Sequence, residues 1–388
     1  MGATKSVTLK DVALRAGVSQ AVVSTVLNDR ANNGVFVSEV TRQRVQDAAR
    51  ELGYVVRHHT LPPVRRLQTR DGQGLEAHLV GLLLGRRFAG SLFTDIFYGV
   101  NSVLTPTGYH PFVLDTYAET YQKAAEKEAE ALQYAQNSHF AGVILWHEGG
   151  PANVNLIQSI RDHHFPIVAI DRRVPGLELD YVGTDNVTGA YEATRHLIQQ
   201  GHTRIAHMTS LSMTDAASER LAGYQKAIHE AGLEANPRHI LLTLDGGRRL
   251  DREMLRQVFT APDAPTAIFL VSDYWAPVVY QELRALGLDV PCDVAMVGFD
   301  DVVQPGFDEL ELTSMAQDFE GIGKTAAQMV LDRIASPERS IVSRVYPARL
   351  IVRESSQKPL AGAPALKTEQ SPSPRFAATG AQAATAVR

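Results

Sequence analysis

The stretch KDVALRAGVSQAVVSTVLN, residues 10–28, predicts two short helices separated by a glycine. Thr8 can cap the first helix and Gly17 can end it, while Ser19 can cap the second helix and Ser38 a third. Apolar residues recur every three or four positions in all three segments, so each helix has one face to bury. We therefore predict a small all-α domain near the N-terminus.

A helix, a turn containing glycine, a second helix and a supporting third helix make up the helix-turn-helix arrangement. Its second helix enters the major groove of DNA. Ser19, Ser24 and Asn28 offer donors to phosphate oxygens, and Gln20 and Ala21 lie where side chains meet base edges. The alternative is an ordinary three-helix cap, in which Ser19 and Asn28 do no more than cap helices.

The charge is divided unevenly along the chain. Residues 1–70 contain 11 Lys/Arg and 5 Asp/Glu, which gives +6, so residues 71–388 carry −11 of the total of −5. A basic N-terminal part predicts that this part binds a polyanion. No apolar run reaches the roughly 18 residues of a membrane span, and we expect a cytoplasmic protein without membrane contact. The single cysteine, Cys292, lies in an apolar stretch, which predicts a buried thiol in a reducing compartment.

Beyond a basic, proline-containing linker, apolar runs alternate with helical patterns. The runs that predict buried parallel strands are HLVGLLL, HPFVLDTY, FAGVILW, PIVAID, RIAHMTS, ILLTL, AIFLVS and VAMVGFD. Alternation of this kind predicts a two-lobed, doubly wound α/β domain, so the fold class is an all-α helix-turn-helix head plus that domain. We place the head at 1–57, the linker at 58–78, the two-lobed domain at 79–356 and a disordered tail at 357–388.

Residues 7–54 resemble the DNA-binding domain of the lactose-repressor (LacI) family of bacterial transcription regulators, in VTLKDVALRAGVS, VSTVLN and VSEVTRQRVQDAARELGY. The resemblance continues in YVGTDNVTGAYEATRHLIQQGH, ERLAGYQKA, VAMVGFDD and LTSMAQDFEGIGKTAAQMVL. It implies a homodimeric repressor that binds double-stranded operator DNA. It also implies a body like that of periplasmic sugar-binding proteins, with a small effector between the lobes that controls operator affinity.

The resemblance also implies which residues contact DNA. In the family the linker becomes a short hinge helix on DNA, and its leucine enters the minor groove; Leu67 is the matching residue. The alternative is an apolar residue in a flexible tether. Val22 stands where the family usually has Thr, and Thr25 where Arg is common, so the operator sequence cannot be transferred. The candidate DNA-binding residues are Thr8, Leu9, Ser19, Gln20, Ala21, Ser24, Thr25, Asn28 and Leu67.

Ligands of doubly wound sheets bind at the carboxyl ends of the strands, so candidate effector residues are those that follow strands. Carboxylates and a guanidinium can hold the hydroxyls of a sugar, which makes a carbohydrate the expected effector. Arg86 keeps an acidic or phosphorylated effector open. The candidates from this rule are Gly85, Arg86, Asp171, Ser272, Asp273, Asp300 and Gln317. The family resemblance adds Arg220, in SERLAGYQKA, at the position that the family uses to clamp its ligand, and Phe93 could stack on the ligand.

Each of these candidates has a structural alternative. Asp171 or Asp300 can cap the next segment, and Arg220 can form a surface salt bridge of little energetic value. Phe93 can belong to an apolar stripe with Phe97, and for this residue the core is the favoured interpretation.

The sequence contains no P-loop, no G-x-S-x-G and no zinc-like cluster of Cys and His. We therefore expect neither a cofactor nor a metal nor enzymatic activity. Two other hypotheses stay open, namely a solute-binding module with a weakened DNA-binding head and a sugar- or nucleoside-processing enzyme. Induction and corepression are equally compatible with the sequence.

Overall fold

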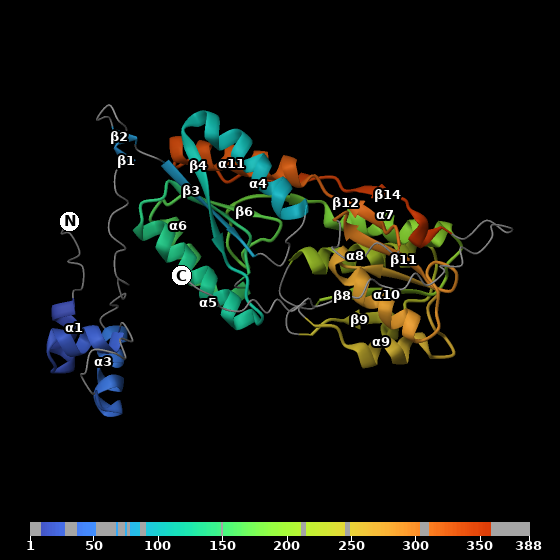
Figure 1. Ribbon diagram of the computed structural model, residues 1–388, viewed down its shortest axis with the longest axis horizontal. Helices are drawn as coiled ribbons and strands as arrows, with labels where there is room; N and C mark the ends of the chain where they lie inside the picture. The colour runs from blue at the N-terminus through green and yellow to red at the C-terminus, as the bar shows by residue number, and fades with distance from the viewer. Residues whose placement is uncertain are drawn as a thin grey trace, which may run out of the picture. The chain divides into compact units, whose positions relative to one another are not determined.

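The structure is a computed structural model that describes residues 9–27, 37–51, 67–68, 74–75, 78–85, 91–148, 150–210, 215–244, 249–302 and 310–357. It contains a helical head and two compact α/β units (Figure 1). The boundaries of the head, linker and tail stay predictions, because the segments around residues 57 and 358–388 lie outside the described ranges.

The head consists of three helices with a shared apolar core. They are α1 (Leu9–Ala16), α2 (Gln20–Leu27) and α3 (Glu39–Glu51). The predicted cap of the third helix is present, because the Ser38 Oγ accepts from the Thr41 amide at 3.3 Å. The helices bury the apolar positions that the sequence periodicity indicated: Val12, Ala13, Ala16, Val23, Val26, Val45, Ala48 and Ala49.

The first α/β unit contains Phe93–Gly183 and Phe319–Arg344 together with β3. Its six-stranded sheet has the order β13-β7-β6-β5-β3-β4, and the pairs from β7 to β4 are parallel. The strands are β3 (His78–Leu84), β4 (Tyr109–Asp115), β5 (Gly142–Leu145), β6 (Ile167–Ile170), β7 (Asp180–Thr184) and β13 (Ser343–Tyr346).

Helices cover both faces of this sheet. Helices α5 (Tyr121–Asn137) and α6 (Val154–Asp162) pack on one face, where Leu83, Val143 and Ile167 point. Helix α11 (Phe319–Ala335) contacts β5 and β6 and lies beside α4 (Ser91–Leu104) (Figure 1).

The second α/β unit contains residues 91–92, Thr184–Asp318 and residues 345–357, so the chain passes between the units more than once. Its sheet has the order β14-β12-β11-β10-β8-β9, in which β14 alone among the described strands is antiparallel to its neighbour. The strands are β8 (Ile205–Thr209), β9 (Ile240–Leu242), β10 (Ala267–Leu270), β11 (Ala295–Asp300), β12 (Thr313–Ala316) and β14 (Arg349–Ile351).

Helices again lie on both faces. Helices α9 (Arg252–Phe259) and α10 (Ala276–Ala285) share a core with Ile268, and α7 (Asn186–Gln199) and α8 (Asp215–Glu230) share one with Phe269. Because adjacent strand residues face opposite sides, this alternation confirms the predicted doubly wound architecture.

Two details differ from what the sequence predicted. All eight predicted strands are present, but β7, β12, β13 and β14 were not among them, because their runs are short or partly polar. Cys292 is exposed, so the prediction of a buried thiol is wrong; it lies in the turn before β11 and not in the strand. Within the described ranges, no helix has both the length and the apolar character needed to cross a membrane.

Candidate functional site

The turn between α1 and α2 has the geometry of a helix-turn-helix. Gly17 has a φ of +65°, and the Val18 amide donates to the Ala13 carbonyl at 3.1 Å, which ends α1. Two residues later the Ser19 Oγ accepts from the Val22 amide at 3.3 Å and begins α2. The left-handed Gly17, followed two residues later by the N-cap Ser19, lets a turn of three residues connect the two helices.

Ser19 and Gln20 are exposed at the start of α2, where a recognition helix presents side chains to DNA. Ser19 also caps the helix, so capping and phosphate contact are compatible roles of one hydroxyl. The other head candidates are placed less fully: Leu9 begins α1, Ala21, Ser24 and Thr25 lie in α2, and Thr8 and Asn28 lie outside the described residues.

Leu67 lies in a short strand in this structure, and the hinge helix that the family resemblance implies on DNA stays a prediction. Leu67 belongs to a two-residue strand, β1 (Leu67–Gln68), which pairs antiparallel with β2 (Gly74–Leu75). The intervening sequence contains Asp71-Gly72, a dipeptide typical of hairpin turns.

In the second unit, predicted effector residues lie at the carboxyl edge of the sheet. Ser272 and Asp273 follow β10, Asp300 ends β11, and Gln317 follows β12. Because these strands are parallel neighbours, their carboxyl ends share one edge. Arg220 reaches the same edge from α8 and completes the group.

Arg220 is held by three acceptors and an aromatic ring. Its Nε donates to the Asn186 Oδ1 at 2.8 Å, and its Nη1 donates to the Val271 carbonyl at 2.5 Å and to the Asp300 Oδ1 at 3.4 Å. Its Cζ lies 3.8 Å from the centre of the Phe299 ring. The side chain is 6% exposed, so the predicted alternative of a surface salt bridge does not apply. Among the described residues, no acceptor pairs with Nη2, which leaves this donor for a ligand.

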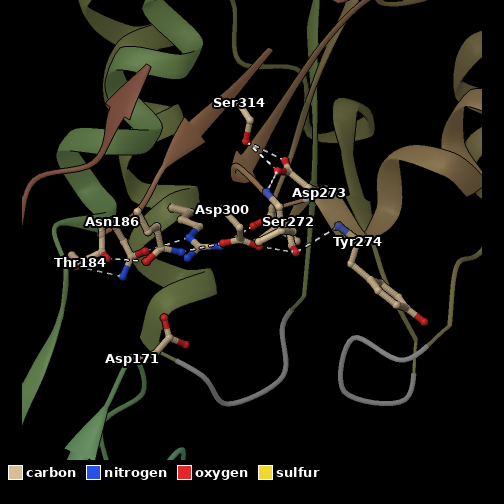
Figure 2. Close-up of polar contacts among 12 residues, drawn as sticks. Asp171, Thr184, Asn186, Ser272, Asp273, Tyr274, Asp300 and Ser314 are labelled. Carbon is tan, nitrogen blue, oxygen red and sulfur yellow. Dashed lines mark hydrogen bonds and ion pairs between the residues drawn. The ribbon is translucent and has the colours of Figure 1, made fainter. Parts of the chain in front are cut away.

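Asp300 is the acceptor at the centre of the group. Besides Arg220, it accepts from the Ser272 Oγ at 2.6 Å and from the Gln317 Nε2 at 2.7 Å (Figure 2). Gln317 in turn accepts from the Thr184 hydroxyl. Asp300 has a φ of +117°, a conformation that non-glycine residues rarely adopt. We name this group, Arg220, Ser272, Asp300 and Gln317 with Asn186 and Thr184, the carboxyl-edge cluster.

Phe299, the ring that packs against the Arg220 guanidinium, belongs to a series of neighbouring aromatic rings. Phe299 lies next to Phe269, which stacks on His207 at 4.8 Å, and His207 stacks on Tyr224 at 5.1 Å. Burial lowers the pKa of His207 to about 3, and the nearby Arg220 charge also lowers it. His207 is therefore neutral at physiological pH and acts as a third ring in the stack. The rings fix the guanidinium plane without adding charge.

Asp273 lies differently from the other candidates. It is 1% exposed, and its carboxyl group accepts from the Val302 amide at 3.0 Å and from the Ser314 Oγ at 2.8 and 2.9 Å (Figure 2). Burial raises the pKa of Asp273 well above its usual value, and the neighbouring Asp300 charge raises it further. A carboxyl group enclosed in this way faces the turn after β11 and not the solvent.

In the first unit, the predicted candidates are less closely grouped. Gly85 is buried at the end of β3, Asp171 follows β6 with a φ of +60° and 6% exposure, and Arg86 lies outside the described residues. Phe93 is half-buried in α4 and stacks on Phe97, with the ring centres 6.4 Å apart, so the choice between a ligand contact and the apolar stripe stays open.

A second polar group, which the sequence did not predict, lies at the carboxyl edge of the sheet in the first unit. Buried Glu128 accepts from the Asn153 Nδ2 at 2.9 Å and lies 3.0 Å from the His147 Nδ1, while Arg172 contacts Glu148 at 3.2 Å. Burial alone would raise the pKa of Glu128, but hydrogen bonds and charge from His147 outweigh it, and the pKa is lowered. His147 and Glu148 directly follow the predicted strand FAGVILW, so the strand-end criterion could have found them. Glu128 gives no such signal, because it comes from the middle of a helix.

These two groups can bind hydroxyls and amides through fixed donors and acceptors. Neither contains an arrangement for metal binding: within the described ranges, no group of three or more His, Cys, Asp or Glu side chains could hold a metal ion. The chemistry at both edges is that of recognition.

Comparison with known proteins agrees with this geometry. Residues 8–56 match the bacterial regulatory proteins of the lacI family, and residues 194–356 match the periplasmic binding protein-like domain. The HTH-type transcriptional regulator CelR of Thermobifida fusca is 34% identical over 355 residues, which cover 90% of this chain and 98% of the relative. The HTH-type transcriptional repressor CytR of Escherichia coli (strain K12) is 29% identical over 353 residues, 90% of this chain and 96% of the relative.

A solved structure of a CelR–cellobiose complex superposes with a TM-score of 0.63 at 31% identity, and covers 90% of this chain and 99% of that chain. The similarity thus extends over the head and both α/β units. The chain belongs to the LacI family of bacterial transcriptional regulators.

Proposed function

We propose that this regulator is a repressor whose affinity for operator DNA is controlled by a neutral carbohydrate bound at the carboxyl-edge cluster. The observation that supports the proposal most directly is the arrangement around Arg220 and Asp300. The Arg220 guanidinium, whose Nη2 has no acceptor among the described residues, lies beside the Asp300 carboxylate, which accepts from Arg220, Ser272 and Gln317. Vicinal hydroxyls of a sugar, each of which donates and accepts, fit such a pair.

The charges of the cluster favour a neutral effector over a phosphorylated one. The positive charge of Arg220 faces Asp300, and Asn186 connects Arg220 to Glu219 through a 2.9 Å hydrogen bond. The described residues of the cluster thus hold no excess of positive charge with which to neutralise a phosphate. Of the relatives, CelR has been solved with cellobiose, which makes cellobiose the first effector to test.

The proposal includes a cytoplasmic homodimer with two heads on one operator. Helix-turn-helix proteins of this kind bind two half-sites whose symmetry mirrors their own. The exposed Ser19 and Gln20 at the start of α2 support contact with one half-site per head. Effector binding is proposed to change the arrangement of the α/β units and, through the linker, the placement of the heads.

Calorimetric titration with cellobiose and with glucose 6-phosphate tests the effector class. We expect the wild type to bind cellobiose and Arg220→Ala to lose it, with no binding of the phosphate in either protein. Arg204→Ala is the matched control, since Arg204 is an exposed arginine that precedes β8, at the opposite edge of the same sheet. Preferred binding of glucose 6-phosphate, or equal loss of cellobiose in both arginine variants, would contradict the proposal.

A further inference from the structure

The backbone is strained at Asp300, the acceptor of the carboxyl-edge cluster, where β11 ends and a turn begins. Asp300 and Asp301 have φ values of +117° and +55°, and neither is a glycine. Successive residues in this region cost free energy that the surrounding structure must offset. Because the Asp300 carboxylate moves with its backbone, whatever holds this turn also decides where that carboxylate lies.

The buried Asp273 holds this turn at two successive amides. The Val302 amide donates directly to the Asp273 Oδ2 at 3.0 Å. The Asp301 amide donates to the Ser314 Oγ at 3.1 Å, and that hydroxyl contacts both Asp273 oxygens. Since Asp273 is 1% exposed, these contacts, and not contact with solvent or ligand, occupy its carboxyl group.

The sheet reserves space for this carboxyl group. A Cβ atom at Gly298 of β11 would lie 1.9 Å from the Asp273 Oδ1, so a larger residue there would displace the carboxyl group. Burial and the neighbouring Asp300 charge raise the pKa of Asp273, and both disfavour the charged form of this carboxyl group. An amide at this position could accept from the Val302 amide and donate to the Ser314 Oγ in the same way.

We propose that Asp273 is a positioning residue: together with Ser314 and Gly298 it fixes the turn 300–302, and thereby sets the Asp300 carboxylate in the place from which it binds the effector. This inference rests on the proposed function, in which Asp300 is an effector-binding residue. It differs from the expectation that Asp273 touches the effector itself.

Three variants separate positioning from general stability. Asp273→Ala removes the acceptor of the Val302 amide and the carboxyl group that holds Ser314, the acceptor of the Asp301 amide; this predicts about a tenfold or larger rise in the Kd for cellobiose. Asp273→Asn keeps both contacts and should bind within about threefold of the wild type, a change below 1 kcal/mol. Asp263→Ala is the matched control and should not change the Kd, because Asp263 is exposed and precedes β10, whereas Asp273 follows it.

Gly298→Ala tests the same role of Asp273 by adding a methyl group beside its carboxyl group. It should weaken cellobiose binding by a similar factor, because the added methyl group meets the Asp273 carboxyl group. Added to Asp273→Ala, it should cause little further loss, since the space is then empty and the other close atom is the flexible end of Leu312. Independent, additive losses would overturn the inference.

Hydrogen exchange of the amides of residues 301 and 302 measures how firmly the turn is held, and it needs no ligand. We expect these amides to be protected in the wild type and in Asp273→Asn, and to exchange faster in Asp273→Ala. Equal protection in all three proteins, or a loss of cellobiose in Asp273→Asn as large as in Asp273→Ala, overturns the positioning role. Failure of the wild type to bind any sugar would instead overturn the proposed function, and the exchange result would still decide how the turn is held.

Discussion

Replacing Arg220 by methionine should destabilise the second α/β unit far more than replacement of a surface arginine. The Arg220 Nη1 lies 3.4 Å from the Asp300 Oδ1, and both side chains are about 7% exposed, so solvent screens the pair weakly. At this distance and an effective dielectric constant of ~20 the attraction is ~5 kcal/mol. Desolvation offsets much of it in the intact pair, but removal of one partner leaves a buried charge.

We therefore expect Arg220→Met to lower the free energy of unfolding by about 3–5 kcal/mol. The double variant Arg220→Met/Asp300→Asn should recover most of this loss, because it leaves no buried carboxylate without its cation. Both variants should lose cellobiose, since the hydroxyls lose the charged donor in each. Stability and recognition would thus separate within one pair of residues.

Urea denaturation measures this effect in one unit if fluorescence comes from that unit alone. The chain has two tryptophans, Trp146 in the first unit and the buried Trp275 in the second. In a Trp146→Phe background, the Trp275 signal reports the unit that contains Arg220. A cost below about 1 kcal/mol for Arg220→Met, or a double variant no more stable than the single one, would refute the reasoning.

Further predictions concern the head and the first unit. Ser19→Ala should lower the stability of the head by about 1 kcal/mol through loss of the N-cap, and Ser19→Asp should keep the cap but weaken DNA binding in a gel-shift assay. Hydrogen bonds from His147, Asn153 and the Glu148 amide, with the His147 charge, outweigh burial and lower the pKa of Glu128. Its contribution to stability is therefore present above the usual value of 4.5 and is lost as pH falls through the lowered pKa. Glu128→Gln should lose this acid dependence in denaturation measured between about pH 6 and about pH 3. In Gly99→Ala the new methyl group would meet the Glu320 carbonyl at 2.2 Å, which should lower the melting temperature by overpacking worth about 1–3 kcal/mol, whereas an unchanged melting temperature would contradict the close helix crossing.

Local periodicity was sufficient to predict the head and the layered α/β architecture. The helix faces around Val12, Val23 and Val45, and the uninterrupted apolar strands, are signals that belong to a few neighbouring residues. The strand-end rule likewise pointed to Arg220's partner Asp300 and to Ser272. These predictions succeed because the carboxyl edge of a parallel sheet follows from strand order and direction alone.

The sequence did not show in which direction each side chain at a strand end points. Asp273 and Asp300 both follow buried strands, yet one is enclosed beneath a turn and the other accepts from the cluster, a difference decided by Gly298 and Ser314 across the sheet. Glu128 reaches its edge from the interior of α5, where sequence shows no more than one acidic residue among several. The role of Leu67 on DNA stays a prediction, because the hinge helix is expected to form only when the linker meets its operator.

The most direct test of the account is the reciprocity between effector and operator. Fluorescence anisotropy with DNA from upstream of the protein's own gene gives the operator Kd with and without saturating cellobiose, and calorimetry gives the cellobiose Kd with and without that DNA. The account predicts that both constants change by the same factor, about five- to 150-fold, since the coupling free energy is shared. An operator Kd that stays the same while cellobiose binds would contradict it.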